Sequence, residues 1–450
     1  MGHFVPHTDD ELARMLADLG LSRLDELFEV VPEALRLATG LDLQAGMSEP
    51  DVAVEMDRLA ARNQVGDELV CFAGAGAYDH EIPAATRALM FRSEFVTAYT
   101  PYQPEVAQGV LQALFEYQTM VARLSGLAVA NASLYDGASA AVEALNLAVT
   151  TKKRETIWVS GGVHPNWRQV MATLAGGTGH RLVDVALRDG VTDWDAVDTS
   201  GEAPAALLVT TPNYLGAIED IARARAMADA HQALLLVGFD PVSAALLRSP
   251  GDQGADVAVG EGQPFGTPLS FGGPYLGLFA CRHEHVRRLP GRLVGRTVDL
   301  EDRPAYVTTL RAREQDIRRE KASSNVCTNQ TLMAVGAMIQ LAWLGTGGLR
   351  DLALRCARGT RYARELLTAI PGVDLAHQAP TVREFALRVP VPAPTVIERM
   401  AEEGYLAGVA VGFDGGVVTN EGDDLLVAVT ERRTREEIDA FAATLEKVVR

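Results

Sequence analysis

The feature that most constrains the fold is a series of short segments that are apolar at every position. In the run Leu234-Leu235-Leu236-Val237 no polar residue alternates with the apolar ones, as expected of a strand that is buried on both faces. Longer segments with helical periodicity, such as 221–231, separate these runs and predict βαβ units with a mainly parallel sheet. The strand candidates are residues 156–159, 206–209, 234–237, 256–259 and 276–280. In such folds the functional loops follow the carboxyl ends of the strands.

The amino-terminal segment is predicted to be helical. Thr8-Asp9-Asp10-Glu11 forms a capping box, and apolar residues follow at helical spacing up to Leu19. A second helix is expected over residues 24–37, interrupted by Pro32. Residues 1–65 are therefore expected to form a helical arm that folds over a neighbouring surface.

The carboxyl-terminal part predicts a smaller α+β domain. A helix over 331–344 ends at Gly345, and two strands and two helices follow, at 384–389, 425–430, 395–403 and 434–449. The expected domains are the arm 1–65, a large α/β domain 66–330 and a small domain 331–450. This is the layout of fold-type I pyridoxal-phosphate enzymes, although doubly wound sheets host many chemistries.

The net charge and the composition limit the classes of partner that this chain is expected to bind. The net charge is −18, which repels phosphate backbones and anionic lipids, so neither nucleic acid nor a membrane is an expected partner. No apolar run is expected to reach the ~18 residues that span a bilayer. No basic and apolar regions of a signal peptide are present, and the four cysteines lie far apart. Reduced thiols and a cytoplasmic location are the expectation.

Three segments could carry a site. Gly74–His80 lacks the third glycine of a dinucleotide loop; Tyr78 and His80 could point into a site, or the segment could be a surface turn. In Tyr99-Thr100-Pro101-Tyr102-Gln103-Pro104 the prolines favour a stiff extended strut. The strut offers Tyr99, Thr100, Tyr102 and Gln103 for recognition of small polar groups, or it merely connects domains.

The third segment, from Ser133 to Ser139, precedes an alanine-rich helix. Its free amides could cradle an anion, and it includes Ser133 and Asp136, although many helices begin this way with nothing bound. Asp240 follows a strand, where fold-type I enzymes place the partner of the pyridinium nitrogen. Strand-end aspartates also commonly cap turns.

A Schiff-base lysine is missing from the expected place. The chain has four lysines, Lys152, Lys153, Lys321 and Lys447, and none lies in 259–268, near the strand end that should follow Asp240. An imine needs an uncharged amine, so no catalytic lysine is expected in this chain. No metal site is expected either, because His283 and His285 diverge at a spacing of two and should form a surface cluster.

Several segments together resemble the glycine cleavage P-protein family, and within it the separate amino-terminal half of the split bacterial enzyme. They are residues 3–8, 74–83, 99–112, 131–137, 260–274 and 318–331. The resemblance implies a fold-type I chain that pairs with a homologous subunit, two of each forming a heterotetramer. It also implies that the partner subunit holds pyridoxal phosphate.

The activity implied by the resemblance is glycine decarboxylation. The aminomethyl group then passes to the lipoyl arm of the H-protein, with release of CO2. Tyr78, His80, Tyr99, Thr100, Tyr102 and Gln103 are expected to contribute to the partner's pocket, and Ser133, Asp136 and Asp240 to form a vestigial cofactor site. Two alternatives stay open: a subunit that only stabilises the complex or docks the H-protein, and an independent aminotransferase or decarboxylase.

Overall fold

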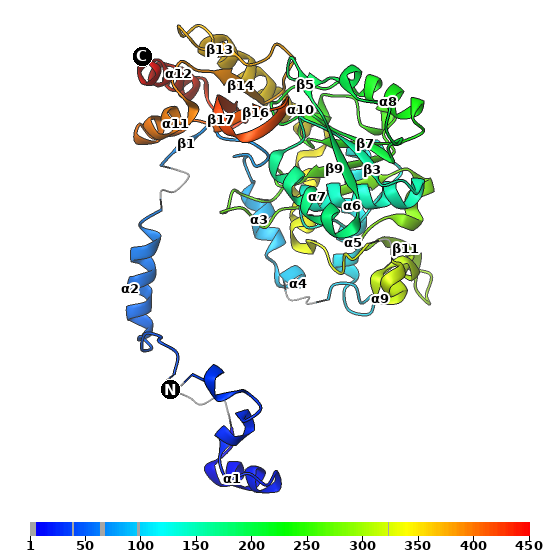
Figure 1. Ribbon diagram of the computed structural model, residues 1–450, viewed down its shortest axis with the longest axis vertical. Helices are drawn as coiled ribbons and strands as arrows, with labels where there is room; N and C mark the ends of the chain where they lie inside the picture. The colour runs from blue at the N-terminus through cyan, green and yellow to red at the C-terminus, as the bar shows by residue number, and fades with distance from the viewer. Residues whose placement is uncertain (1–5, 38–39, 64–67, 97–99, 323) are drawn as a thin grey trace. The chain divides into compact units, whose positions relative to one another are not determined.

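The computed structural model describes residues 6–37, 40–63, 68–96, 100–322 and 324–450 (Figure 1). The chain separates into two compact units, Met1–Gln64 and Val65–Arg450.

The first unit contains the predicted amino-terminal helix. Helix α1 (Asp9–Asp18) begins with the expected capping box, in which Thr8 and Glu11 hydrogen-bond each other's backbone. The predicted helix over 24–37 is wrong: two short 3₁₀ helices, η1 (Leu24–Phe28) and η2 (Glu33–Leu35), flank Pro32. A further helix, α2 (Glu49–Ala60), begins after the cap Ser48. Among the described residues of this unit only Leu16 is buried, so the unit has almost no core of its own.

The second unit is built on a seven-stranded sheet with the strand order β2-β10-β9-β8-β7-β3-β4. Strands β3, β4, β7, β8 and β9 are parallel, and β10 is antiparallel to both of its neighbours. The bounds are β2 Val129–Ala130, β3 Thr156–Ser160, β4 Arg181–Val185, β7 Ala206–Thr211, β8 Leu234–Phe239, β9 Val257–Glu261 and β10 Gly277–Cys281. The five predicted strands are confirmed to within two residues.

Helices cover both faces of this sheet, as the apolar runs require. Leu236 of β8 packs in the cluster that holds helix α6 (Gly137–Lys152), whereas its neighbours Leu235 and Val237 pack toward helix α8 (Ile221–Ala230). Helix α7 (Pro165–Thr178) lies beside α6 (Figure 1). At the β2–β10 end, α5 (Gln108–Ser125) and α10 (Thr331–Leu367) pack together in a third cluster.

A smaller antiparallel sheet follows, with the order β13-β14-β17-β16. Its strands are β13 Asp374–Leu375, β14 Glu384–Arg388, β16 Val409–Asp414 and β17 Val417–Ala428, and helices α11 (Ala393–Glu402) and α12 (Arg435–Val449) cover it. The short strand β1 (Val70–Cys71) pairs in parallel with β15 (Tyr405–Leu406), and Phe72 packs in the core of this layer. The first described residues of the second unit thus pack with its last hundred. The division into domains at residue 330 stays a prediction.

Shorter elements complete the second unit. They are α3 Ala84–Met90, α4 Ser93–Val96, α9 Gln315–Arg318, the hairpins β5 Leu187–Arg188 with β6 Val191–Thr192 and β11 Val294–Val298 with β12 Pro304–Thr308, and 3₁₀ turns at Trp194–Ala196, Ser243–Ala245, Gly251–Gln253, His283–Arg288, Arg311–Arg313 and Arg319–Lys321. His285 in one of these turns is buried, so the expected surface cluster at 283–285 is only partly exposed.

Helix α10 corrects one expectation about apolar runs. Within the described residues it is the one helix that is long and apolar enough to cross a membrane by length and composition. It is broken at Gly345, whose backbone is not helical (φ 60°, ψ −176°), and it packs against α3, α5 and α12. These contacts are those of a core helix.

Candidate functional site at the carboxyl edge of the sheet

A cavity of about 80 Å³ lies where strands β7, β8 and β9 end, and we refer to it as the edge cavity. This is the edge at which doubly wound folds bind ligands. Its lining includes Tyr78, His164, Trp167, Asn213, Asp240, Glu261, Arg383 and Glu384. None of the four lysines lies among these residues, all of which the structure describes.

Arg383, in the loop before β14, joins three of the predicted site residues. Its Nη2 donates to Asp240 Oδ1 at 2.7 Å, and its Nη1 donates to His80 Nε2 at 2.6 Å. Its guanidinium lies over the Tyr78 ring, 3.4 Å from the centroid, in a cation–π contact. We refer to Tyr78, His80, Asp240, Arg383 and Glu431 as the Arg383 cluster.

The protonation of His80 follows from its neighbours. A guanidinium can only donate, so His80 Nε2 must accept and its proton sits on Nδ1. Nδ1 then donates to Glu431 Oε2 at 2.6 Å. Burial raises the pKa of Glu431, but the His80 side chain and the backbone N–H groups of Glu81 and Glu431 together outweigh burial and lower this pKa to about 2.

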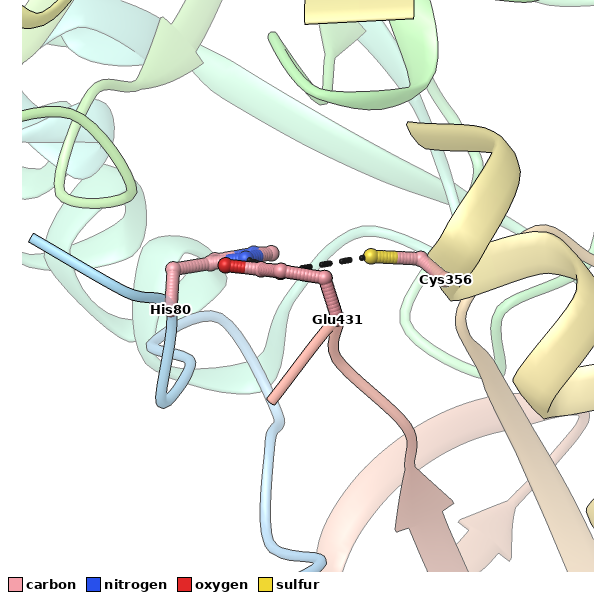
Figure 2. A group of neighbouring side chains, drawn as sticks. All are labelled: His80, Cys356 and Glu431. Carbon is pink, nitrogen blue, oxygen red and sulfur yellow. Dashed lines mark hydrogen bonds and ion pairs between the residues drawn. The ribbon is translucent and has the colours of Figure 1, made fainter. Parts of the chain in front are cut away.

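Figure 2 shows His80 and Glu431 side by side, with Cys356 reaching toward Glu431 from α10. These three side chains come close enough to share a metal ion. The Nδ1 proton already bridges His80 and Glu431, and the nearby Arg383 adds a positive charge. The geometry therefore favours a hydrogen-bonded group over a cation site.

A second group with metal-ligand chemistry is Asp256, Glu284 and His285. The Asp256 carboxylate already pairs with Arg225 and Arg282, at 2.9 and 3.0 Å. Two guanidinium groups beside the carboxylate disfavour a further cation there.

The Gly74–His80 loop is folded inward. The Tyr78 hydroxyl donates to Glu384 Oε2 at 2.9 Å, and the Ala75 N–H donates to Glu384 Oε1 at 2.6 Å. A Cβ on Gly74 would lie 2.4 Å from that same Oε1, so the close approach requires glycine. Burial raises the pKa of Tyr78, and it raises the pKa of Glu384 to about 7. Tyr78 and His80 are thus buried inside the chain.

The proline-rich segment 100–107 is a succession of turns rather than an extended strut. Thr100 and Gln103 are exposed, and Tyr99 lies outside the described residues. The Tyr102 hydroxyl contacts Thr328 Oγ1 at 3.2 Å and donates to Asn329 Oδ1. Arg292 lies 5.0 Å above the Tyr102 ring.

Asn329 connects this segment to the start of α6. Its Nδ2 donates to Ser133 Oγ at 2.9 Å, and Ser133 is fully buried with a left-handed backbone (φ 115°). We refer to Tyr102, Ser133, Arg292, Thr328 and Asn329 as the Tyr102 cluster. Of the predicted residues, Tyr78, His80 and Asp240 thus lie around Arg383, and Tyr102 and Ser133 lie around Asn329.

Asp136 and Asp240 both cap backbone N–H groups. Asp136 Oδ1 accepts the Ser139 N–H at 2.7 Å as the N-cap of α6. Asp240 Oδ2 accepts the Ser243 N–H at 2.9 Å, in addition to its ion pair with Arg383. The capping alternative is thus realised at both positions.

Sequence reasoning missed Arg383, Glu261 and Asn329 as site residues. The signal for Arg383 and Glu384 is that two adjacent charged residues stand at the start of a predicted strand, where charged residues are rarely fully buried without a partner. Glu261 lay in the segment that was considered only for its missing lysine. Asn329 lay inside one of the motifs that carry the family resemblance.

Comparison with known proteins agrees with this architecture. A family model described as "Glycine cleavage system P-protein" matches residues 2–445. A relative in Desulforamulus reducens, named "Probable glycine dehydrogenase (decarboxylating) subunit 1", is 46% identical over 444 residues, 98% of this chain and 99% of the relative.

Two solved structures place the fold. A glycine decarboxylase (P-protein) of the glycine cleavage system, in inhibitor-bound form, superposes with a TM-score of 0.88 at 41% identity, covering 99% of this chain and 100% of that one. An alanine–glyoxylate aminotransferase from Nostoc, at 17% identity, has a TM-score of 0.59 over 87% of this chain and 98% of its own. The fold is that of fold-type I pyridoxal-phosphate enzymes, as predicted. Because the family model spans nearly the whole length, the chain belongs to the glycine cleavage system P-protein family.

Proposed function

We propose that this chain is the subunit of a glycine decarboxylase that does not hold the cofactor. With a homologous partner subunit, two of each, it would decarboxylate glycine, release CO2 and deliver the aminomethyl group to the lipoyl arm of the H-protein. The names of the full-length relatives support glycine as the substrate and a second subunit as the partner. The four free cysteines agree with a cytoplasmic complex.

The residues of the edge cavity do not fit pyridoxal phosphate, and this observation carries the proposal. No lysine lines the cavity within the described chain. The Asp240 carboxylate, which would face a pyridinium nitrogen, is paired with Arg383. The cofactor of the complex therefore belongs in the partner subunit, and no reaction step is assigned to the edge cavity of this chain.

The contribution of this chain is positioning and exclusion of water at the partner's pocket. Thr100, Tyr102 and Gln103, with Tyr99 beside them, are the proposed contacts, because the described members keep exposed surface and Tyr102 is oriented by Thr328 and Asn329. Tyr78 and His80 are buried, so they would act by fixing the backbone of their loop. Ser133, Asp136 and Asp240 would remain as scaffold.

The test is glycine–bicarbonate exchange by the reconstituted complex of both subunits and lipoylated H-protein. Tyr102→Phe and Gln103→Ala should each lower kcat/KM about tenfold, the cost of one positioning hydrogen bond, while the complex still assembles. Tyr405→Phe is the matched control, since it removes a tyrosine hydroxyl from β15 in the smaller layer. It should leave the exchange rate unchanged.

Two other outcomes favour the alternatives. Wild-type exchange by both variants in an intact complex would indicate a subunit that only stabilises the assembly or docks the H-protein. An aldimine absorbance band in this chain purified alone with pyridoxal phosphate, abolished by replacing one of its four lysines, would indicate an independent enzyme.

A further inference from the structure

The side chain of Glu261 lies at the amino-terminal end of helix α6. Its Oε2 accepts the N–H of Gly137, the first residue of this 16-residue helix, at 2.9 Å. Its Oε1 accepts the N–H groups of Gln263 and Leu276 at 3.0 and 2.9 Å. One carboxylate therefore satisfies three backbone donors.

The start of α6 thus already holds two carboxyl groups. Burial raises the pKa of Glu261 to about 7, while its three backbone N–H donors favour the ionised form. Free N–H groups and the helix dipole favour an anion at such an end. Asp136 accepts the Ser139 N–H there, and Glu261 accepts that of Gly137. A phosphate entering this place would compete with both carboxyl groups for the same N–H donors, and every carboxylate that is ionised would repel it.

The indole of Trp167 also packs against the first residue of α6. It packs so closely on Gly137 that a Cβ at this position would lie 2.1 Å from Trp167 Cζ2. Glu261 and Trp167 both line the edge cavity, whose volume of about 80 Å³ is room for a few water molecules.

The charge on the other side of the cavity is also balanced internally. The buried Arg383 guanidinium is held by Asp240 and His80. The two features of the cavity that could bind a phosphorylated ligand, the N–H groups at the start of α6 and the Arg383 guanidinium, are thus both occupied by the chain's own side chains.

We infer that Glu261 is an internal substitute for a phosphate group and a specificity-determining residue that keeps phosphorylated ligands out of this chain's cavity. Removing the carboxylate leaves the N–H groups of Gly137, Gln263 and Leu276 without an acceptor, and a free phosphate can then take its place. The inference goes beyond the proposed function, because it concerns ligand exclusion by this chain and is tested without any decarboxylation.

The experiment measures binding of inorganic phosphate to the full-length chain, by calorimetry and by thermal unfolding, against chloride at matched ionic strength. The wild-type chain should show no binding heat and no change in Tm. Glu261→Ala should have a lower Tm in chloride, and phosphate at ten times its Kd should raise that Tm by about 2 °C.

Glu143→Ala is the matched control. Glu143 is a buried carboxylate further along α6, with no hydrogen bond to the first N–H groups of the helix. This variant should not respond to phosphate.

A folded E261A chain that ignores phosphate would overturn the inference, as would an equal phosphate response in E143A. Submillimolar phosphate binding by the wild-type chain would overturn it too, and that measurement needs no variant to fold. Loss of the proposed decarboxylase role would leave all these binding results unchanged, so the two failures are distinguishable.

Discussion

At the residue scale, the edge cavity is governed by partners that are distant in sequence. Arg383 meets Asp240 across 143 positions and His80 across 303. The sequence correctly placed Asp240 at a strand end, but no residue near Asp240 in the sequence indicates that an arginine from the loop before β14 pairs with it. The clusters around Arg383 and Asn329 were therefore only partly predictable: motifs singled out several of their members, but the contacts that join them did not follow from the sequence.

Replacing Arg383 by Met is expected to destabilise the chain by about 3–5 kcal/mol, because it leaves the Asp240 carboxylate buried without its partner. Urea unfolding followed by circular dichroism measures this loss. The double variant R383M/D240N should recover part of it. Arg361→Met, which removes an exposed ion pair with Glu365, should cost less than about 0.5 kcal/mol. A similar small cost for R383M would contradict the assigned role.

Glu384 predicts a pH dependence of stability. Burial raises the pKa of this side chain in the folded chain to about 7, from a usual 4.5. The folded state then binds the proton more tightly, so this contribution is fully present below pH 4.5 and is lost as pH rises toward 7. Glu384→Gln should flatten the fall in unfolding free energy between pH 5 and about 7.5, by up to about 3 kcal/mol. Equal slopes for E384Q and the wild-type chain would refute this.

At the element scale, the long strands of the main sheet were predictable because burial on both faces requires an apolar residue at nearly every position. Strand β8 (Leu234–Phe239) has no exposed residue, and its sequence contains no polar or charged side chain. The two-residue strand β1 and the turns at 100–107 have no such pattern in the sequence, since they are too short for any periodicity. Helix α10 was predicted only to residue 344, because its glycines read as an end where the structure has a kink.

The kink in α10 predicts opposite effects on stability for two glycine substitutions. Gly345 has a backbone conformation that is accessible to glycine but strained for other residues, although nothing lies within 4 Å of a Cβ there. Gly345→Ala should therefore lower the free energy of unfolding by about 1–3 kcal/mol. Gly347→Ala, two residues on in helical backbone with equally open space, should raise it by up to about 1 kcal/mol. Thermal unfolding of both variants checks the opposite signs.

At the scale of the whole molecule, the layout of a large α/β layer and a smaller α+β layer followed from the order of predicted elements. That the first unit is a helical arm stays a prediction, and its exposed apolar side chains, among them Phe28, Val30, Leu35 and Leu43, are ones that such an arm could bury against a neighbouring surface. Within the described residues, the five hydrophobic clusters are made by residues 70–449. The second unit therefore has what it needs to fold by itself.

Deletion of residues 1–64 is expected to leave the remaining chain folded, with a Tm within about 2 °C of the full-length value, because no cluster loses a member. Assembly with the partner subunit should weaken, since the exposed apolar side chains of the arm are lost. Circular dichroism and analytical ultracentrifugation measure the two effects. If the truncated chain assembles as tightly as the full-length chain, the arm is not part of the interface.

Arg383 has a mechanical consequence as well. It directly precedes β14 of the smaller sheet and pairs with Asp240, which directly follows β8 of the larger one, so a rotation of one layer against the other would break a buried ion pair. The second unit should accordingly behave as one stiff body. In the proposed decarboxylase complex it would then serve as a rigid support for the pocket of the partner subunit.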